Sequence, residues 1–510
     1  MNAFKAWYRQ PLSETTIKKY KWFYVFAIYT GVAAICVVNM LTRGLDIDSY
    51  YIITQGEEIT RLNNVPRINT VTFLDNYKII VQQWLYCLLM YKTKLYAGNT
   101  GLIIFGLMQQ LYLFGLIQHI LSKRYDDKII TYGLTALICI SIKDYFCTLR
   151  AENITLILLL LQCNSLDNYI RTKKQKYLYQ LPIWTLLEIN LHASMWIFHF
   201  CIILAYIVPN IFKHNIDHYI KMNKHVITSL SLMGASLFIN PYGIDCVTYV
   251  FKSLHVFNYI DIKEQQNTEY ATFLGITLLV TILLTLTFYN LKILKSSTFY
   301  LSIGFAFLAT TSYHSTMFIL IAQTYLICDL CAYIKTKNIQ KICHCMKNDI
   351  CLLAIALNIL AISVTGIIYV NYIHKFDKIE ALDQIIEYVK ENNPDGHILN
   401  MMDAGSYLEY NDVKNILMDT RPELMSEKIN EQYNMILDIY VLSTHYMMSE
   451  HKDYYGNYLN KYDIQYILDY ASTPAYAGLS GYLSGCDNYQ VVMIVDNYIL
   501  YERIDKINTK

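Results

Sequence analysis

Charged residues are scarce in this chain, as are glycine (19) and proline (8). Asp, Glu, Lys and Arg make up only 16% of the 510 residues, whereas soluble globular proteins carry about a quarter. The sequence contains no phosphate-binding glycine loop, nucleophile elbow or His-Glu-x-x-His motif, which argues against an ATP-driven pump, a serine hydrolase and a zinc protease. The formal net charge of +1 indicates no nucleic-acid partner.

Cysteine is present, but its placement excludes a disulfide framework. Most of the 13 cysteines lie in apolar segments, and residues 376–510 contain only Cys486. The run Cys343-His344-Cys345 lacks a second ligand pair at the spacing that zinc sites require. We therefore predict no metal site from cysteine and histidine spacing, and nothing in the sequence requires an oxidising compartment.

Apolar residues are abundant, at 54% of the chain. They form long blocks within residues 1–375, while 376–510 has the composition of a soluble domain. A membrane-spanning helix needs roughly twenty apolar residues. The candidate spans are 22–42, 100–121, 129–142, 151–168, 178–192, 194–212, 226–241, 271–291, 297–312, 313–334 and 349–372. We predict a polytopic α-helical membrane protein of about eleven spans over 1–375, followed by a small C-terminal α/β extracytoplasmic domain.

In the C-terminal domain, segments with the two-residue period of a β-strand alternate with segments that have the 3.6-residue period of an α-helix. Strand-like runs occupy 397–402, 413–419, 464–470, 490–496 and 498–503, and helical patterns occupy 379–392, 422–447 and 450–462.

Lysine and arginine clusters set the expected orientation. The first, near residues 18–21, precedes the first span, and the others follow alternate spans, near residues 123–128, 171–176, 213–224, 292–295 and 335–347. All fall on one side if the Trp- and Tyr-rich stretch 81–97 lies in the interface instead of crossing. The chain is then a multi-pass protein of the cell membrane with a cytoplasmic N-terminus, and loop 43–99 and the C-terminal domain lie outside.

The first outer loop begins with two carboxylates, Asp46 and Asp48, and continues to Glu57. A carboxylate at the membrane surface can take the proton of an acceptor hydroxyl, or hold a divalent metal. The alternative is that these acids are a solvated interface after a span.

Other polar residues stand at predicted outer ends of spans. Arg150 suits a lipid phosphate because its fork donates two parallel hydrogen bonds; alternatively it is a snorkelling anchor paired with Glu152. Glu188 and His192 are four residues apart and would share a helical face with Asn190 nearby, to line a cavity or to form a simple ion pair. The remaining candidates are Glu264, in loop 242–270, and His314.

Taken together, these segments resemble bacterial multi-span proteins related to the GT-C glycosyltransferases, which include protein mannosyltransferases and the lipid A aminoarabinose transferase. The landmarks are Asp48-x-Tyr50-Tyr51, Gly56, Ile59, Val65-Pro66, Gln83-Trp84-Leu85, Arg150-Ala151-Glu152, Asn190-Leu191-His192, Asn240-Pro241-Tyr242-Gly243, Ile262-Lys263-Glu264, Gly405-x-Tyr407-Leu408, Asp419-x-Arg421 and a closing strand pair at Asp496. Gln83 stands where the subgroup has Glu, Glu188-Ile189 where it often has Trp, and His314 where it often has Arg.

The resemblance implies a polyprenyl-phosphate sugar as the donor and no certain cofactor, although a divalent metal is an option. Asp48 would be the base for an acceptor on the outer face, assisted by Asp46 or Glu57. Arg150, Glu152, Asn190, His192, Glu264 and His314 would bind the phosphate and sugar of the donor. The sequence leaves two other readings open: a non-catalytic protein that binds lipid-linked glycans or a partner in envelope assembly, and a transporter.

Overall fold

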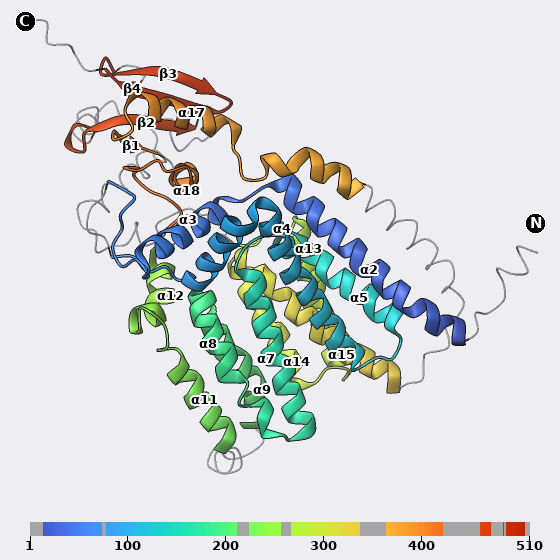
Figure 1. The fold of residues 1–510 in the computed structure, drawn as a ribbon. Coiled ribbons are helices and arrows are strands. Elements are labelled where there is room, and N and C mark those ends of the chain that lie inside the picture. The colour runs from blue at the N-terminus through green and yellow to red at the C-terminus, as the bar shows by residue number, and fades with distance from the viewer. Residues whose placement is uncertain are drawn as a thin grey trace, which may run out of the picture.

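The structure is a computed structural model that describes residues 14–73, 78–211, 224–256, 267–336, 364–400, 402–421, 459–470, 483 and 486–504. Figure 1 shows a bundle of helices with a small sheet-containing part at one end, which we call the domain end of the bundle. The expected helical body followed by a small α/β part is therefore confirmed. The number of membrane crossings and the side on which the C-terminal part lies stay predictions.

Ten of the eleven apolar segments coincide with described helices. The helices of the bundle are α2 (Glu14–Arg43), α4 (Trp84–Ser122), α5 (Lys128–Ser141), α7 (Glu152–Thr172), α8 (Leu181–Leu191), α9 (Trp196–Ile211), α11 (Lys224–Ser236), α13 (Phe273–Asn290), α14 (Ser296–Thr311) and α15 (Ile319–Thr336). Shorter helices are α6 (Lys143–Phe146) and α12 (Ile244–Val256), with single turns at Gln175–Tyr177, Ala193–Met195, His314–Phe318 and Ile373–Lys375. The last predicted segment, 349–372, lies outside the described residues up to 363, and 364–372 is helical.

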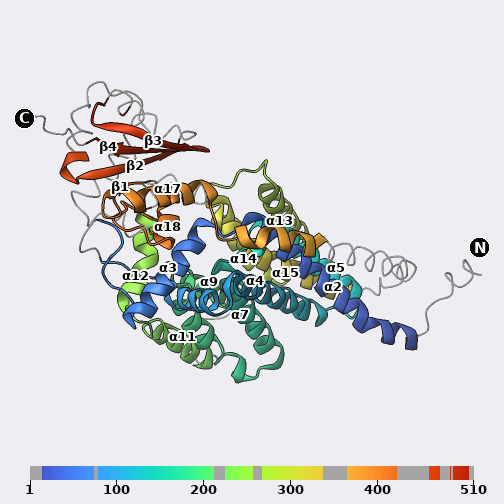
Figure 2. The same cartoon turned by 45° about the horizontal axis from the view of Figure 1, so that its top comes forward.

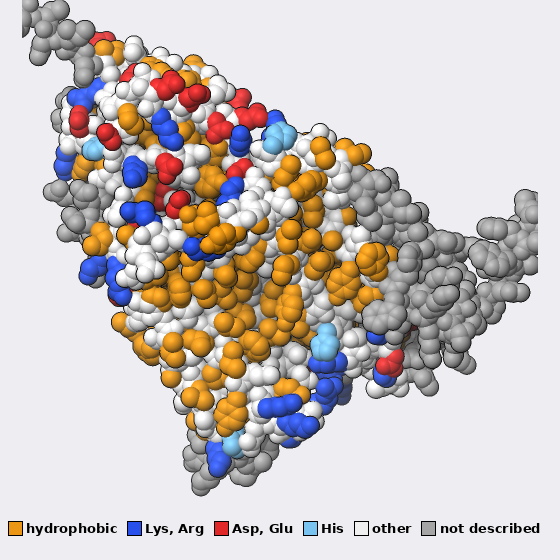
Figure 3. Space-filling model, in the orientation of Figure 1, with side chains coloured by type: hydrophobic (Ala, Val, Ile, Leu, Met, Phe, Trp, Pro, Cys, Tyr) orange, Lys and Arg blue, Asp and Glu red, His pale blue; other side chains and the backbone are white. Residues whose placement is uncertain are grey.

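The surface of the bundle matches a protein that contacts lipid. Four described helical segments are long and apolar enough to cross a membrane: Val25–Arg43, Trp84–Ser122, Phe273–Asn290 and His314–Thr336. On the face shown in Figure 3, hydrophobic side chains cover the middle of the bundle, acidic and basic side chains gather over the C-terminal part, and basic side chains gather again at the opposite end. An apolar belt between two charged ends is what a bilayer would select.

Helix α4 is divided by Gly98. This residue has φ 59° and ψ −155°, a conformation that essentially only glycine adopts. A straight helix of 39 residues would be roughly 58 Å long, about twice the thickness of the apolar core of a bilayer. The kink lets the half before Gly98 follow a different direction from the half after it, as the sequence reading of 81–97 requires.

The first half of α4 packs closely against α3 (Ile47–Leu62). A Cβ atom placed on Gly56 would lie 2.1 Å from the Cys87 carbonyl oxygen and 2.6 Å from Cβ of Tyr91. No side chain fits there, so the two helices approach at van der Waals contact of their backbones. This pair forms the platform on which the C-terminal part rests.

The described residues of the C-terminal part form a four-stranded sheet with two helices. The strands β1 (His397–Leu399), β2 (Ile464–Tyr470), β3 (Tyr489–Val495) and β4 (Tyr498–Arg503) follow the order β1-β2-β4-β3. β1 pairs parallel to β2, and the other pairs are antiparallel. The apolar face of α17 (Glu380–Asn392), with Leu382, Ile385 and Val389, packs on this sheet. Helix α18 (Met402–Tyr410) lies between the sheet and α3 (Figure 2).

Two predictions for this part are corrected. The predicted strand 397–402 is shorter than expected, because β1 ends at Leu399 and α18 begins at Met402. Residues 413–419 form only isolated bridges, in which Ile416 pairs with Ile398 and with Thr72. This segment does form strand-like bridges, but it lies between Thr72 and β1 and is not one of the strands of the sheet. The predicted helices 422–447 and 450–462 lie outside the described residues except for 459–462.

Aromatic rings and one ion pair fasten α18 to the platform. The Tyr50 ring of α3 meets Tyr407 at 4.8 Å and Tyr410 at 5.1 Å between centroids. The Tyr410 hydroxyl donates to Asp377 Oδ2 at 3.0 Å, and Lys94 of α4 pairs with the same carboxylate. Contacts from α3, α4 and the segment before α17 thus converge on one helix.

A buried charged cluster lies beside these rings. Gln55 Nε2 of α3 donates to Glu409 Oε1 at 3.1 Å, and Arg421 pairs with Asp419. The Arg421 guanidinium lies 6.0 Å from the centre of the Tyr51 ring. Burial raises the pKa of the Glu409 carboxyl well above its usual range; Arg421 opposes this shift and Asp419 adds to it. Asp419 already balances Arg421, so Glu409 is held as the neutral acid.

Replacing Glu409 with Gln is expected to remove a pH dependence of stability. The folded protein holds a proton on Glu409 that the unfolded chain releases above about pH 4.5. Its stabilisation is therefore complete below that pH and is lost as the pH rises through the raised pKa. Gln keeps the acceptor for Gln55 and does not titrate. The melting temperature of the wild type, measured from pH 5 to 9, should fall relative to Glu409→Gln; parallel curves would contradict the assignment.

Candidate functional site

Asp46 is held at the domain end of the bundle by the turn that joins α2 to α3. Gly44 turns the chain with φ 70°, and Leu45 N donates to the Phe376 carbonyl at 2.8 Å. Asp46 is then the N-cap of α3: its Oδ1 accepts from the Ser49 backbone N–H at 2.8 Å and from Ser49 Oγ at 2.5 Å. A capping carboxylate is preferred here because it satisfies the first free N–H groups of a helix.

Arg150, more than a hundred residues later, lies between the two carboxylates of the first loop. Its Nε pairs with Asp46 Oδ2, and its Nη2 lies 3.2 Å from Asp48 Oδ2. The side chain of Arg150 is 16% exposed, that of Asp46 32% and that of Asp48 38%. Both oxygens of Asp46 are engaged by the cap and by Arg150, so Asp46 positions the arginine. Asp48 is the more accessible carboxylate and is oriented by the same guanidinium.

The structure brings Glu152 and His314 together, a contact that was not predicted. His314 Nε2 lies 3.7 Å from Glu152 Oε1. Glu152 begins α7 two residues after Arg150, and His314 begins the turn that joins α14 to α15. The ring of His192 has Glu152, Glu188 and His314 as its charged or titratable neighbours. Glu152 follows Arg150 by two residues in the chain, so this group lies near the arginine that contacts the two carboxylates.

Glu188 and His192 do not make the direct contact that a four-residue spacing suggests. Helix α8 ends at Leu191, and His192 has φ −158° and ψ 74°, so the two residues no longer share a helical face. Thr155 of α7 lies between them: its Oγ1 is 2.6 Å from Glu188 Oε1 and 2.9 Å from His192 Nδ1. Another side-chain contact of Glu188 is with His199 of α9, whose Nε2 lies 3.3 Å from Glu188 Oε2.

The structure places two other candidates, Asn190 and Glu57, elsewhere, and it does not describe a third, Glu264. Asn190 accepts from Trp84 Nε1 at 3.0 Å and donates to the Ile239 carbonyl at 2.9 Å, so it ties α4 to the end of α11. Glu57 is exposed beside Tyr91. It lies nine residues after Asp48, which is two and a half helical turns and about 13 Å along α3, so it faces the opposite side of the helix. Glu264 lies outside the described residues.

Thr155 and His199 contact the predicted residues Glu188 and His192 but were not themselves predicted as site residues. Thr155 lies three residues after Glu152, so it shares that face of α7, but a threonine in an apolar helix carries no signal by itself. His199 could have been found, because an ionisable residue inside an apolar run usually faces a partner or a cavity.

No metal centre emerges from the part of the chain that the structure describes. Among those residues, no group of three or more His, Cys, Asp or Glu side chains is arranged to hold an ion. Among the described residues, the carboxylates that this site offers to a divalent metal are Asp46 and Asp48, and both contact Arg150.

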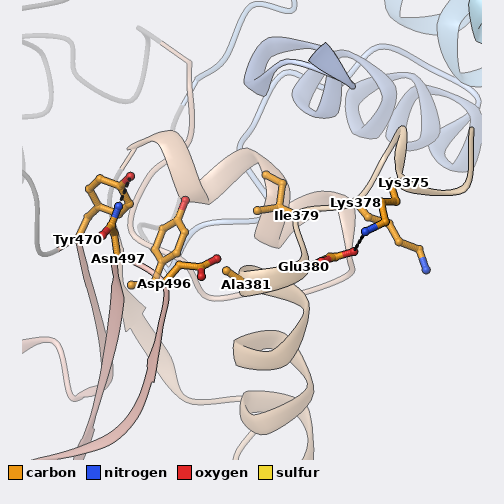
Figure 4. A pocket seen from close by; sticks show the side chains of 9 residues that line it. Lys375, Lys378, Ile379, Glu380, Ala381, Tyr470, Asp496 and Asn497 are labelled. Atoms are coloured by element: carbon orange, nitrogen blue, oxygen red, sulfur yellow. Dashed lines mark hydrogen bonds and ion pairs between the residues drawn. The ribbon is translucent and has the colours of Figure 1, made fainter. Parts of the chain in front are cut away.

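A separate open cavity of about 680 Å³ lies between the segment before α17 and the sheet. Figure 4 shows Tyr470 and the Asp496–Tyr498 turn on one side and Lys375, Lys378 and Glu380 on the other. None of the predicted site residues lines it, and Lys375 forms an ion pair with Glu380 at 2.6 Å.

Comparison with known proteins supports the fold. No protein-family model matches the sequence, and no curated protein matches it. The oligosaccharyltransferase of Archaeoglobus fulgidus in its apo form is similar in structure, with a TM-score of 0.53 and 10% identity over 90% of this chain and 70% of that one. The same enzyme tethered to an acceptor peptide that contains the NVT sequon matches with a TM-score of 0.54 and 12% identity over 94% and 73%. The chain therefore has a GT-C-like fold.

Proposed function

We propose that this protein is a membrane glycosyltransferase that moves a sugar from a polyprenyl-phosphate donor to an envelope glycan, lipid or protein. The observation that carries the proposal is the contact of Arg150 with Asp46 and Asp48 at the domain end of a GT-C-like bundle. The two solved structures described above are of an oligosaccharyltransferase. The domain end then faces the outside of the cell, and the N-terminus faces the cytoplasm.

In the proposed reaction, Asp48 takes the proton of the acceptor hydroxyl. The acceptor oxygen forms a bond to the anomeric carbon, the bond from that carbon to the phosphate oxygen breaks, and polyprenyl phosphate leaves. One-step displacement of this kind inverts the anomeric centre. Arg150 orients Asp48 and offers its guanidinium to the phosphate, with Glu152, His192 and His314 behind it.

The second candidate is a non-catalytic protein that binds lipid-linked glycans. The Arg150 guanidinium favours it, because its fork can bind a lipid phosphate through two parallel hydrogen bonds without any transfer of the sugar. Binding without turnover would distinguish this candidate from the transferase.

The test uses the full-length protein in lipid nanodiscs with labelled polyprenyl-phosphate hexoses and pentoses, and membranes of a deletion strain as the acceptor. We expect transfer of label and release of polyprenyl phosphate. Arg150→Ala should lower transfer about 10²-fold or more, as loss of a charge-stabilising donor does. Arg171→Ala, an exposed site at the other end of α7, is the matched control. Binding of donor without transfer would favour the second candidate, and neither binding nor transfer would overturn both.

A further inference from the structure

A chain of buried polar side chains runs from His192 into the bundle. It passes through Thr155 and Glu188 to His199, and ends at Gln162. Glu188, His199, Thr155 and Gln162 are fully buried, and His192 is 5% exposed. Buried polar groups of this kind are costly unless each hydrogen bond is made. The protons shared by these side chains can therefore be assigned one after another, starting from Gln162.

Gln162 fixes the orientation of His199. The amide nitrogen of Gln162 lies 2.6 Å from the backbone carbonyl of His199, which can only accept. The amide oxygen of Gln162 therefore faces His199 Nδ1, and that nitrogen must carry a proton to donate. His199 Nε2 is left to meet Glu188 Oε2 at 3.3 Å.

One proton is shared between His199 Nε2 and Glu188 Oε2. Either His199 is an imidazolium beside a carboxylate, or His199 is neutral and Glu188 donates from Oε2. In both arrangements Glu188 Oε1 is an acceptor. A proton on Oε1 instead would leave a buried imidazolium beside a neutral acid, which burial opposes.

Thr155 has a single hydroxyl proton, and Glu188 Oε1 takes it at 2.6 Å. Thr155 Oγ1 can then only accept from His192 Nδ1, 2.9 Å away. We propose that Glu188, acting through Thr155, holds His192 with its proton on Nδ1, so that Nε2 is the nitrogen available to a ligand. Glu188 and Thr155 are positioning residues, and His192 offers a lone pair or, once protonated, an N–H donor.

The nature of that ligand rests on the proposed function, in which it is the donor phosphate near Glu152 and His314. The assignment of the His192 proton to Nδ1 is independent of the proposed function. Neutral histidine in water favours the proton on Nε2. A proton on Nδ1 of His192 would therefore show directly that Thr155 accepts a hydrogen bond from it.

Solid-state NMR of the full-length protein, labelled with ¹⁵N-histidine and placed in lipid bilayers at pH 9, tests the assignment. The signal of His192 is identified by its loss in His192→Gln. We expect the Nδ1–H form in the wild type and the Nε2–H form in Thr155→Val, which keeps the shape but not the hydroxyl. Thr155→Ser should restore Nδ1–H. Glu188→Gln should keep it, since the amide can donate to His199 and accept from Thr155.

An Nε2–H signal in the wild type, or an Nδ1–H signal that survives in Thr155→Val, would overturn the proposal. The transfer assay reports separately on the reaction. If the tautomers follow expectation while the wild type transfers no sugar, the proposed function fails and the proton assignment stands. If the wild type is active, Thr155→Val should lower transfer about tenfold and Thr155→Ser should restore it.

Discussion

Asp48→Asn is expected to abolish sugar transfer while leaving the protein folded. Asn has the same shape and can still accept a hydrogen bond from Arg150, but it cannot take a proton. Loss of a general base lowers a rate by about 10²- to 10⁴-fold. The exposed fraction of the Asp48 side chain is 38%, so little buried charge is left without a partner. A loss of sugar transfer in Asp48→Asn would therefore reflect the loss of the base and not a loss of folding.

The measurement is the envelope glycan of a deletion strain that carries wild type, Asp48→Asn or Asp126→Asn. Asp126 pairs with Lys335 at 2.7 Å and its side chain is 72% exposed, between α4 and α5 at the opposite end of the bundle, so it is a matched control. Wild type and Asp126→Asn should restore the missing sugar, and Asp48→Asn should not, at equal amounts in the membrane. Full restoration by Asp48→Asn would mean that Asp48 is not the base, and the binding protein would become the better reading.

Arg421→Met should strongly lower the stability of the packing of the C-terminal part against α3. Arg421 is 1% exposed and its Nε lies 2.9 Å and 2.7 Å from the two oxygens of Asp419. Methionine fills a similar length but leaves the Asp419 carboxylate buried without its cation. Breaking a buried pair by removing one partner costs about 3–5 kcal/mol. Thermal melting and limited proteolysis of the full-length protein would measure the loss.

Arg503→Met is the control for that experiment. Arg503 pairs with Asp463 at 2.6 Å, but the Asp463 side chain is 87% exposed, and exposed pairs contribute about 0–1 kcal/mol. The double variant Arg421→Met with Asp419→Leu should recover most of the stability, because it removes both buried charges. Equal losses in Arg421→Met and Arg503→Met would show that the buried pair contributes no more than a surface one.

Some features could be read directly from the residues. Apolar runs predicted ten of the described helices because burial in lipid or in a bundle requires a continuous apolar stretch. The strands Ile464–Tyr470 and Tyr498–Arg503 were found from their enrichment in β-branched and aromatic residues. By contrast, residues 43–80 were expected to be an outer loop, and the helix Ile47–Leu62 within them was not predicted.

Helix α18 was missed for a local reason. Its sequence, MDAGSYLEY, contains Gly405, which disfavours a helix. A Cβ at that position would lie 1.9 Å from the Met418 carbonyl oxygen. Glycine is therefore required by the close approach of another segment, and tertiary packing outweighs the propensity. The separation of Glu57 from Asp48 likewise follows once α3 is known to run as one helix from Ile47 to Leu62.

The apolar helices, the different composition of the C-terminal part and the charged residues at the ends of helices could be predicted, because these depend on composition and on a local period. Which of those residues meet became known from the packing of the helices. Arg150 reaches Asp46 across 104 positions, and Thr155 separates Glu188 from His192 because α8 ends one residue early. Such contacts are set by how helices pack against one another, and no local pattern encodes the partner of a side chain that lies on another helix.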